Sequence, residues 1–119
     1  MYGSEQQHAE ALARWLNTLR GCSFTHVPNE TGSSDEAKRR AVRMNRAGTS
    51  SGFPDYLIFY RGKRIAIELK KDIKSKASKQ QLEWLKVLAS FGFECAVCHG
   101  WDEAKEFVES VAGKELVEF

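Results

Sequence analysis

The sequence has few of the features that mark secreted or membrane-bound proteins. It holds only three cysteines, Cys22, Cys95 and Cys98, and so small and odd a count fits a reducing compartment better than a disulfide framework. No apolar run approaches the roughly 18 residues that a transmembrane helix needs. The segment Met1–Glu10 lacks the basic-then-apolar layout of a signal peptide. We therefore expect a cytoplasmic protein that does not enter a membrane.

An excess of charge of one sign is also missing, because the net charge is only +2. Composition alone therefore does not indicate nucleic-acid binding. Internal repeats and low-complexity blocks are absent from the sequence as well. The 119 residues are 42% apolar and 29% charged, which suffices to bury the core of one domain. We expect a single domain over residues 1–119.

Apolar residues at three- and four-residue spacing predict the helices. The first prediction is Ser4–Leu19, with Ser4 as the N-cap. Another helix begins at Ser78 and ends before Gly92, and a last helix follows Asp102, which we predict to cap it. A basic segment, residues 37–47, is also helical in pattern.

Short runs of β-branched and aromatic residues predict strands at residues 24–27, 55–60, 64–70 and 94–99. Arg61-Gly62 is short enough to join the second and third of these as a hairpin. The order of the elements predicts an α/β fold with one mixed β-sheet flanked by helices on both faces.

The hairpin brings two acidic residues together. If Arg61-Gly62 is a two-residue turn, counting outward places Asp55 directly opposite Glu68. Facing side chains have Cβ atoms about 4.5 to 5.5 Å apart, so two carboxylates there repel unless a cation lies between them. Lys70 points to the same face, because the strand period is two residues. This arrangement suits Mg²⁺ or Mn²⁺ beside a phosphate.

An ordinary structural role is the alternative for each of these residues. An acid and a lysine two residues apart on an exposed strand usually form a solvated ion pair. Glu68, however, lies between Ile67 and Leu69 in a strand apolar enough to be central. An unpaired acid there is costly, which favours a functional role for the combination.

At this point the sequence resembles a known family. The runs Gly52-Phe53-Pro54-Asp55 and Ile67-Glu68-Leu69-Lys70, followed by Ser78, Gln81, Trp84 and Leu85, resemble the VRR-NUC (virus-type replication-repair nuclease) domain of the PD-(D/E)xK superfamily. The resemblance spans nearly the whole chain. It implies a restriction-endonuclease-like α/β fold and Mg²⁺- or Mn²⁺-dependent hydrolysis of DNA phosphodiesters. Stand-alone viral and phage members are similar to Holliday junction resolvases, which are homodimers that act on branched DNA in DNA repair.

The resemblance also implies roles for individual residues. Asp55 and Glu68 would bind the metal, with the backbone carbonyl of Leu69 as a further ligand, and Lys70 would orient the attacking water and stabilise the phosphate. Gln81 matches a family glutamine that reaches back toward the site. An acid on the first helix usually completes the set. Glu5 fits the family pattern better than its competitor Glu10, and a solvated surface carboxylate is the alternative for both.

The distribution of positive charge agrees with a DNA substrate. Basic residues form two blocks, the first of Lys38, Arg39, Arg40, Arg43 and Arg46, and the second of Lys70, Lys71, Lys74, Lys76 and Lys79. Such blocks bind phosphates without reading sequence, although solvated faces can look the same. We thus expect a nuclease for branched DNA, in a bacterium or a phage-infected host. The alternatives are an inactive nucleic-acid-binding module with this fold and a phage scaffold protein.

Overall fold

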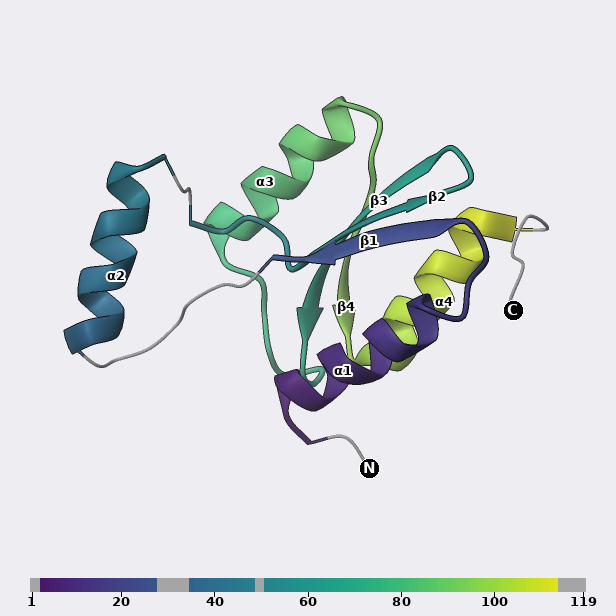
Figure 1. Cartoon of the computed structure of the whole chain (residues 1–119), viewed down its shortest axis with the longest axis horizontal. Helices are drawn as coiled ribbons and strands as arrows, with labels where there is room; N and C mark the ends of the chain where they lie inside the picture. The colour runs from purple at the N-terminus through teal and green to yellow at the C-terminus, as the bar shows by residue number, and fades with distance from the viewer. Residues whose placement is uncertain (1–2, 28–34, 49–50, 114–119) are drawn as a thin grey trace.

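The computed structural model of the protein describes residues 3–27, 35–48 and 51–113. Helices and strands alternate along these residues, as Figure 1 shows. Their bounds are α1 (Glu5–Leu16), β1 (Cys22–His26), α2 (Asp35–Arg46), β2 (Tyr56–Tyr60), β3 (Lys63–Lys70), α3 (Lys79–Ser90), β4 (Glu94–His99) and α4 (Trp101–Ala112). None of the described helices is long and apolar enough to cross a membrane.

The described strands form one mixed sheet in the order β1-β2-β3-β4. β1, β2 and β3 pair antiparallel, whereas β4 lies parallel to β3 because α3 carries the chain back between them. Helices α1 and α4 pack together on one face of the sheet, and α3 covers the other (Figure 1). The predicted α/β fold, a mixed sheet flanked by helices, is confirmed.

The larger core lies between the sheet and the pair α1 and α4. Ile58, Ile65 and Ile67 of the sheet are fully buried against Leu12 of α1 and Val108 of α4. On β3 these isoleucines alternate with residues that face α3, as the strand period requires. The sheet is thus apolar toward α1 and α4, which leaves the α3 side for the polar residues of β3.

The β2–β3 hairpin has the predicted register, with Tyr60 opposite Lys63. Arg61 and Gly62 both have positive φ, 48° and 84°, the backbone of the two-residue turns that match the twist of the strands. Counting outward from this turn therefore gave the correct facing pairs.

Two predicted helix boundaries were wrong. Helix α1 ends at Leu16, because the Thr18 hydroxyl and backbone N–H both bind the carbonyl of Trp15 and turn the chain toward β1. Asp102 lies in the first turn of α4, whose N-cap is Gly100. The first free N–H of α4, that of Trp101, instead donates to Nδ1 of His8 at 3.1 Å, so a side chain of α1 supplies the cap.

Helix α2 stands apart from the sheet and from the other helices (Figure 1). Its acids, Asp35 and Glu36, lie in the first turn, and its last turn carries Arg43 and Arg46. This distribution complements the helix dipole. The local sequence therefore stabilises α2 as a helix without a packing partner in the sheet.

Candidate nuclease site

Four of the predicted site residues come together where β2 begins and β3 ends. Asp55 directly precedes β2, Glu68 and Lys70 lie on β3, and Gln81 lies in the first turn of α3. The register that pairs Tyr56 with Ile67 sets Asp55 against Glu68 one residue further along. The site therefore lies on the α3 side of the sheet, away from the larger core.

Asp55 is 6% exposed, and its position follows from the unequal lengths of the two strands. β3 extends past the last residue of β2 that it pairs with. Beyond the pair of Tyr56 and Ile67, the backbone of β3 has no β2 residue to bond with. The Asp55 carboxylate provides the hydrogen bond instead, because its Oδ2 accepts the Leu69 N–H at 2.8 Å. The N–H and C=O of one strand residue point to the same neighbour, so the Leu69 carbonyl lies on the Asp55 side of β3.

Glu68 is only 1% exposed. Its Oε2 accepts a hydrogen bond from Nε2 of Gln81 at 3.0 Å and lies 3.4 Å from Nζ of Lys70. With Asp55 and Glu68 both ionised, the buried Oε1 of Glu68 accepts no hydrogen bond from the described residues. A buried carboxylate oxygen left unmatched is costly, so Glu68 needs either a proton or a cation at this atom.

The pKa of Glu68 also indicates that this carboxylate needs a proton or a cation beside it. Burial, and then the negative charge and hydrogen bonding of Asp55, raise the pKa of Glu68 to about 8, although Lys70 acts in the opposite direction. Two adjoining carboxylates in a buried place disfavour each other's charged form, and Lys70 offsets this only in part, since the pKa of Glu68 stays raised. The pair is thus arranged to bind either a proton or a metal ion.

Gln81 holds Glu68 and the start of α3 with the same side chain. Its Oε1 accepts the Ser78 N–H at 2.7 Å, while the Ser78 hydroxyl accepts the Gln81 N–H at 3.1 Å. This reciprocal pair is a capping box. Because the amide oxygen is used in the cap, the amide nitrogen is left to face Glu68.

The segment before Asp55 is fitted tightly against α3. Gly52 has φ +88°, and a Cβ there would lie 2.7 Å from the backbone carbon of Gln80. The Phe53 ring meets the Trp84 ring edge-on, with centroids 5.0 Å apart. These two contacts fix the approach of the chain to Asp55, so Phe53 packs beside the site.

The basic loop that follows β3 carries Lys71, Lys74 and Lys76, all exposed. The carboxylate of Asp72 folds this loop by accepting the N–H groups of Lys74 and Ser75 at 2.9 and 3.0 Å. The ring of His99 at the end of β4 contacts the Ser75 carbonyl at 3.0 Å. The lysines are thereby displayed next to Lys70.

The acids predicted on the first helix lie outside this group. Glu5 and Glu10 are both exposed on α1, and Glu10 accepts a long hydrogen bond from Gln6 at 3.4 Å. Among the described residues, no third histidine, cysteine, aspartate or glutamate joins Asp55 and Glu68 in a metal-binding cluster. The structure therefore assembles Asp55, Glu68, Lys70 and Gln81 and leaves Glu5 and Glu10 at the surface.

Sequence reasoning missed several supporting residues. The Ser78–Gln81 capping box was readable from the Ser-x-x-Gln spacing, but its connection to Glu68 was not. His8 and His99 were readable from no local pattern, because each binds a segment far away in the sequence.

A comparison of the sequence with protein families and a comparison of the fold with solved structures lead to the same family. The family model of the VRR-NUC domain matches residues 3–102. A solved structure described as a VRR_NUC domain protein superposes with a TM-score of 0.71 at 22% identity, covering 97% of this chain and 91% of that chain. No curated protein sequence matches the chain significantly. The structural likeness concerns the fold, and the sequence match covers every site residue named above.

Proposed function

Because the chain belongs to the VRR-NUC domain family, we propose that it is a metal-dependent, structure-selective DNA endonuclease that hydrolyses phosphodiester bonds. The family is one of nucleases. The observation that carries the proposal is the buried group of Asp55, Glu68 and Lys70, in which Oε1 of Glu68 accepts no hydrogen bond within the described chain when both acids are ionised. Buried polar atoms of this kind need a partner, and a divalent cation is the partner that two carboxylates favour.

Mg²⁺ or Mn²⁺ suits the donor set. Asp55 and Glu68 supply carboxylate oxygens, and the backbone carbonyl of Leu69 supplies a third oxygen on the same side of β3. Mg²⁺ is commonly bound by one or two carboxylates together with substrate phosphates and waters, so a small protein ligand set is sufficient. When bound, the ion would stabilise the negative charge that develops on the phosphate.

The side chains of the chain itself position the reactants. Lys70 extends from the buried pair toward the solvent, with 15% of its side chain exposed, so its ammonium group can contact both Glu68 and an incoming phosphate. There it orients the attacking water and stabilises the charge on the phosphate. Gln81 holds the Glu68 carboxylate in place through its 3.0 Å hydrogen bond.

Branched DNA, such as a Holliday junction, is the substrate we propose, and a homodimer is the form that acts on it. The support is the resemblance to junction-cleaving nucleases, together with the exposed lysines Lys71, Lys74 and Lys76 beside the site. In a dimer these lysines occur twice, once for each strand to be cut. Their contacts with phosphates would be independent of sequence, as a structure-selective nuclease requires.

The test is a nicking assay on a four-way junction, a flap and a linear duplex, with Mg²⁺ or Mn²⁺. We expect Asp55→Asn and Lys70→Met to lose at least about 100-fold in rate while still binding the junction in metal-free buffer. Asp102→Asn, which removes an exposed acid from α4, is the matched control and should cleave like the wild type. Equal rates in all four proteins, or no cleavage by the wild type, would leave only the inactive binding module.

A further inference from the structure

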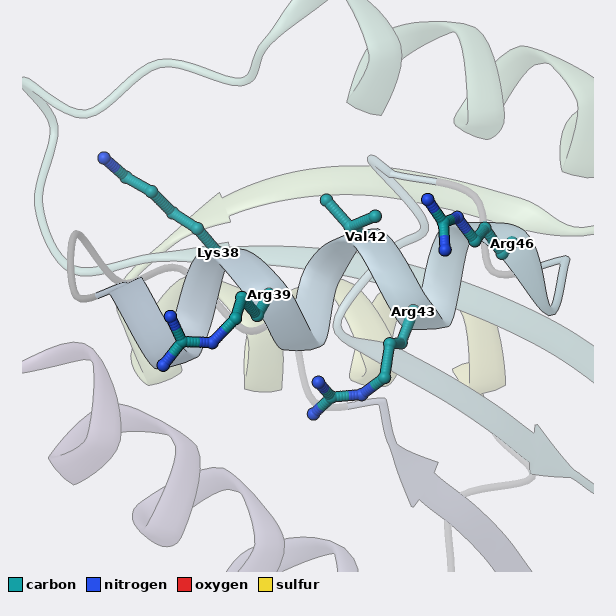
Figure 2. Close-up of a pocket in the computed structure, with 5 residues that line it drawn as sticks. All are labelled: Lys38, Arg39, Val42, Arg43 and Arg46. Atoms are coloured by element: carbon teal, nitrogen blue, oxygen red, sulfur yellow. The ribbon is translucent and has the colours of Figure 1, made fainter.

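The basic residues of α2 are not equivalent. Lys38, Arg39, Arg43 and Arg46 line one hollow on the surface of the helix, with Val42 between them. Figure 2 shows Lys38, Val42 and Arg46 along one side of the hollow, with Val42 between the two cations, and Arg39 and Arg43 along the other side. Among the residues that the structure describes, no acid lines this hollow. The hollow is therefore lined by four cations and by one apolar side chain, that of Val42.

Arg40 is not among the residues that line the hollow. Its guanidinium lies 3.5 Å from Oε1 of Glu36, one turn earlier. Within the described part of the chain, none of the four residues that rim the hollow forms such an ion pair. An ion-paired arginine is partly neutralised, so the positive potential of α2 is concentrated over the hollow.

The chemistry of the hollow matches a sugar–phosphate chain. Val42 is 49% exposed, so it offers an apolar surface to the carbon face of a deoxyribose, while the surrounding cations meet phosphates. Arg39 and Arg46 are separated by two helical turns, about 10 Å along the axis. A DNA strand carries one negative charge at every phosphate, so a stretch of this length can present more than one phosphate to the cations.

The position of α2 in the chain connects the hollow to the proposed catalytic group. β1 precedes α2, and the segment after α2 leads through Gly52 and Phe53 directly to Asp55. The N–H of Val27, at the end of β1, donates to the Asp55 carbonyl at 2.6 Å. Both connections of α2 thus start at the edge of the site, although the helix itself stands away from the sheet (Figure 1).

We propose that α2 is an arm that grips the sugar–phosphate backbone beside the bond to be cut, through Lys38, Arg39, Arg43 and Arg46, with Arg40 outside the contact. This inference rests on the proposed function for the identity of the ligand as DNA. An acidic protein segment would also be attracted to the cations. DNA is favoured because the arm is joined to the proposed site of phosphodiester hydrolysis and because the repeated phosphates of one strand can meet several of the cations at once.

The experiment compares two charge-matched double variants by fluorescence anisotropy with a labelled four-way junction, in EDTA, between 50 and 200 mM NaCl. R39Q/R43Q removes two cations from the rim of the hollow. R40Q/K105Q removes Arg40 and Lys105, which pair with Glu36 and Glu109. We expect R39Q/R43Q to weaken binding about tenfold or more and to reduce the salt slope by about 2, since each lost phosphate contact removes about 1. The control should change affinity less than about twofold.

Three results would overturn the inference. They are equal loss of affinity in both double variants, unchanged binding by R39Q/R43Q, and displacement of the junction by polyglutamate as effective as displacement by unlabelled DNA of equal charge. The assay contains no metal and measures no cleavage, so it is separate from the test of catalysis. A wild type that binds through the arm but does not nick DNA with Mn²⁺ would refute the nuclease proposal and leave the arm in place.

Discussion

Gln81 donates a hydrogen bond to Glu68 across 13 residues of sequence, with 3.0 Å between Nε2 and Oε2. The oxygen of the same amide accepts the N–H of Ser78 at the start of α3. The cap of a helix and the orientation of a buried carboxylate thus depend on one side chain. A change at Gln81 should affect stability and activity together, and suitable variants can separate the two effects.

The first prediction concerns this double role. Gln81→Glu keeps an oxygen for the Ser78 N–H but places a carboxylate against Glu68, so we expect α3 to stay capped and cleavage to fall by at least about tenfold. Ser78→Ala removes the hydroxyl of the cap and should lower the free energy of unfolding by about 1 kcal/mol with cleavage within about twofold of wild type. Urea unfolding and nicking rates measure the two effects. Full activity of Gln81→Glu would show that the contact with Glu68 is dispensable.

The second prediction concerns the close approach at Gly52. Gly52→Ala should lower the unfolding free energy by about 1 to 3 kcal/mol from its positive φ alone, and the new Cβ should also push the start of α3 from its place. Because Gln81 moves with it, we expect cleavage to fall about 10- to 100-fold. Stability and nicking rate are measured on the same samples.

Gly62→Ala is the matched control for this variant. Gly62 has a similar φ of +84°, but nothing lies within 4 Å of a Cβ there. It should lose stability from backbone strain while the activity of the folded protein stays at the wild-type level. If the two variants lose activity equally, the contact between Gly52 and α3 does not position the site.

The third prediction is a pH dependence of stability without metal. The pKa of Glu68 is raised to about 8 from 4.5, so the folded protein holds a proton that the unfolded chain releases. The stabilising contribution is fully present below about pH 4.5 and is lost as the pH rises through about 8. In EDTA, the free energy of unfolding should decline from pH 5 to pH 8, as measured by urea titration.

Glu68→Gln is the control, because it cannot release that proton and should show a smaller decline. Added Mn²⁺ should stabilise the wild type more at pH 8 than at pH 6, since a metal must displace the proton, and should stabilise Glu68→Gln much less. A wild-type stability that rises between pH 5 and pH 8 by as much as that of the variant would contradict the role of Glu68.

The fourth prediction concerns the acid on α1. The family resemblance favours Glu5 as a further metal ligand, whereas the structure has both Glu5 and Glu10 exposed. If Glu5 completes the site when metal and DNA bind, Glu5→Gln should raise the Mn²⁺ concentration needed for half-maximal cleavage, and Glu10→Gln should not. Identical metal titrations for the two variants would remove Glu5 from the site.

The members of the group formed by Asp55, Glu68, Lys70 and Gln81 were predictable to different degrees. Asp55, Glu68 and Lys70 followed from a two-residue turn and the strand period, because hairpin register is a local property and each facing pair is fixed by counting. Gln81 came only from the family resemblance, since its contact with Glu68 requires α3 to pack on the sheet. His8 as the cap of α4 followed from neither, because the donor and the acceptor are 93 residues apart.

The sequence by itself determined the elements whose causes are local: the capping box of α3, the β2–β3 hairpin and the concentration of cations on α2. Tertiary structure alone decided which of those charges act together. It buried Glu68 beside Asp55, where water can no longer screen them, and it separated Arg40 from the four cations that rim the hollow. Burial and the directions of side chains depend on the packing of distant segments, and no spacing along the chain specifies that packing.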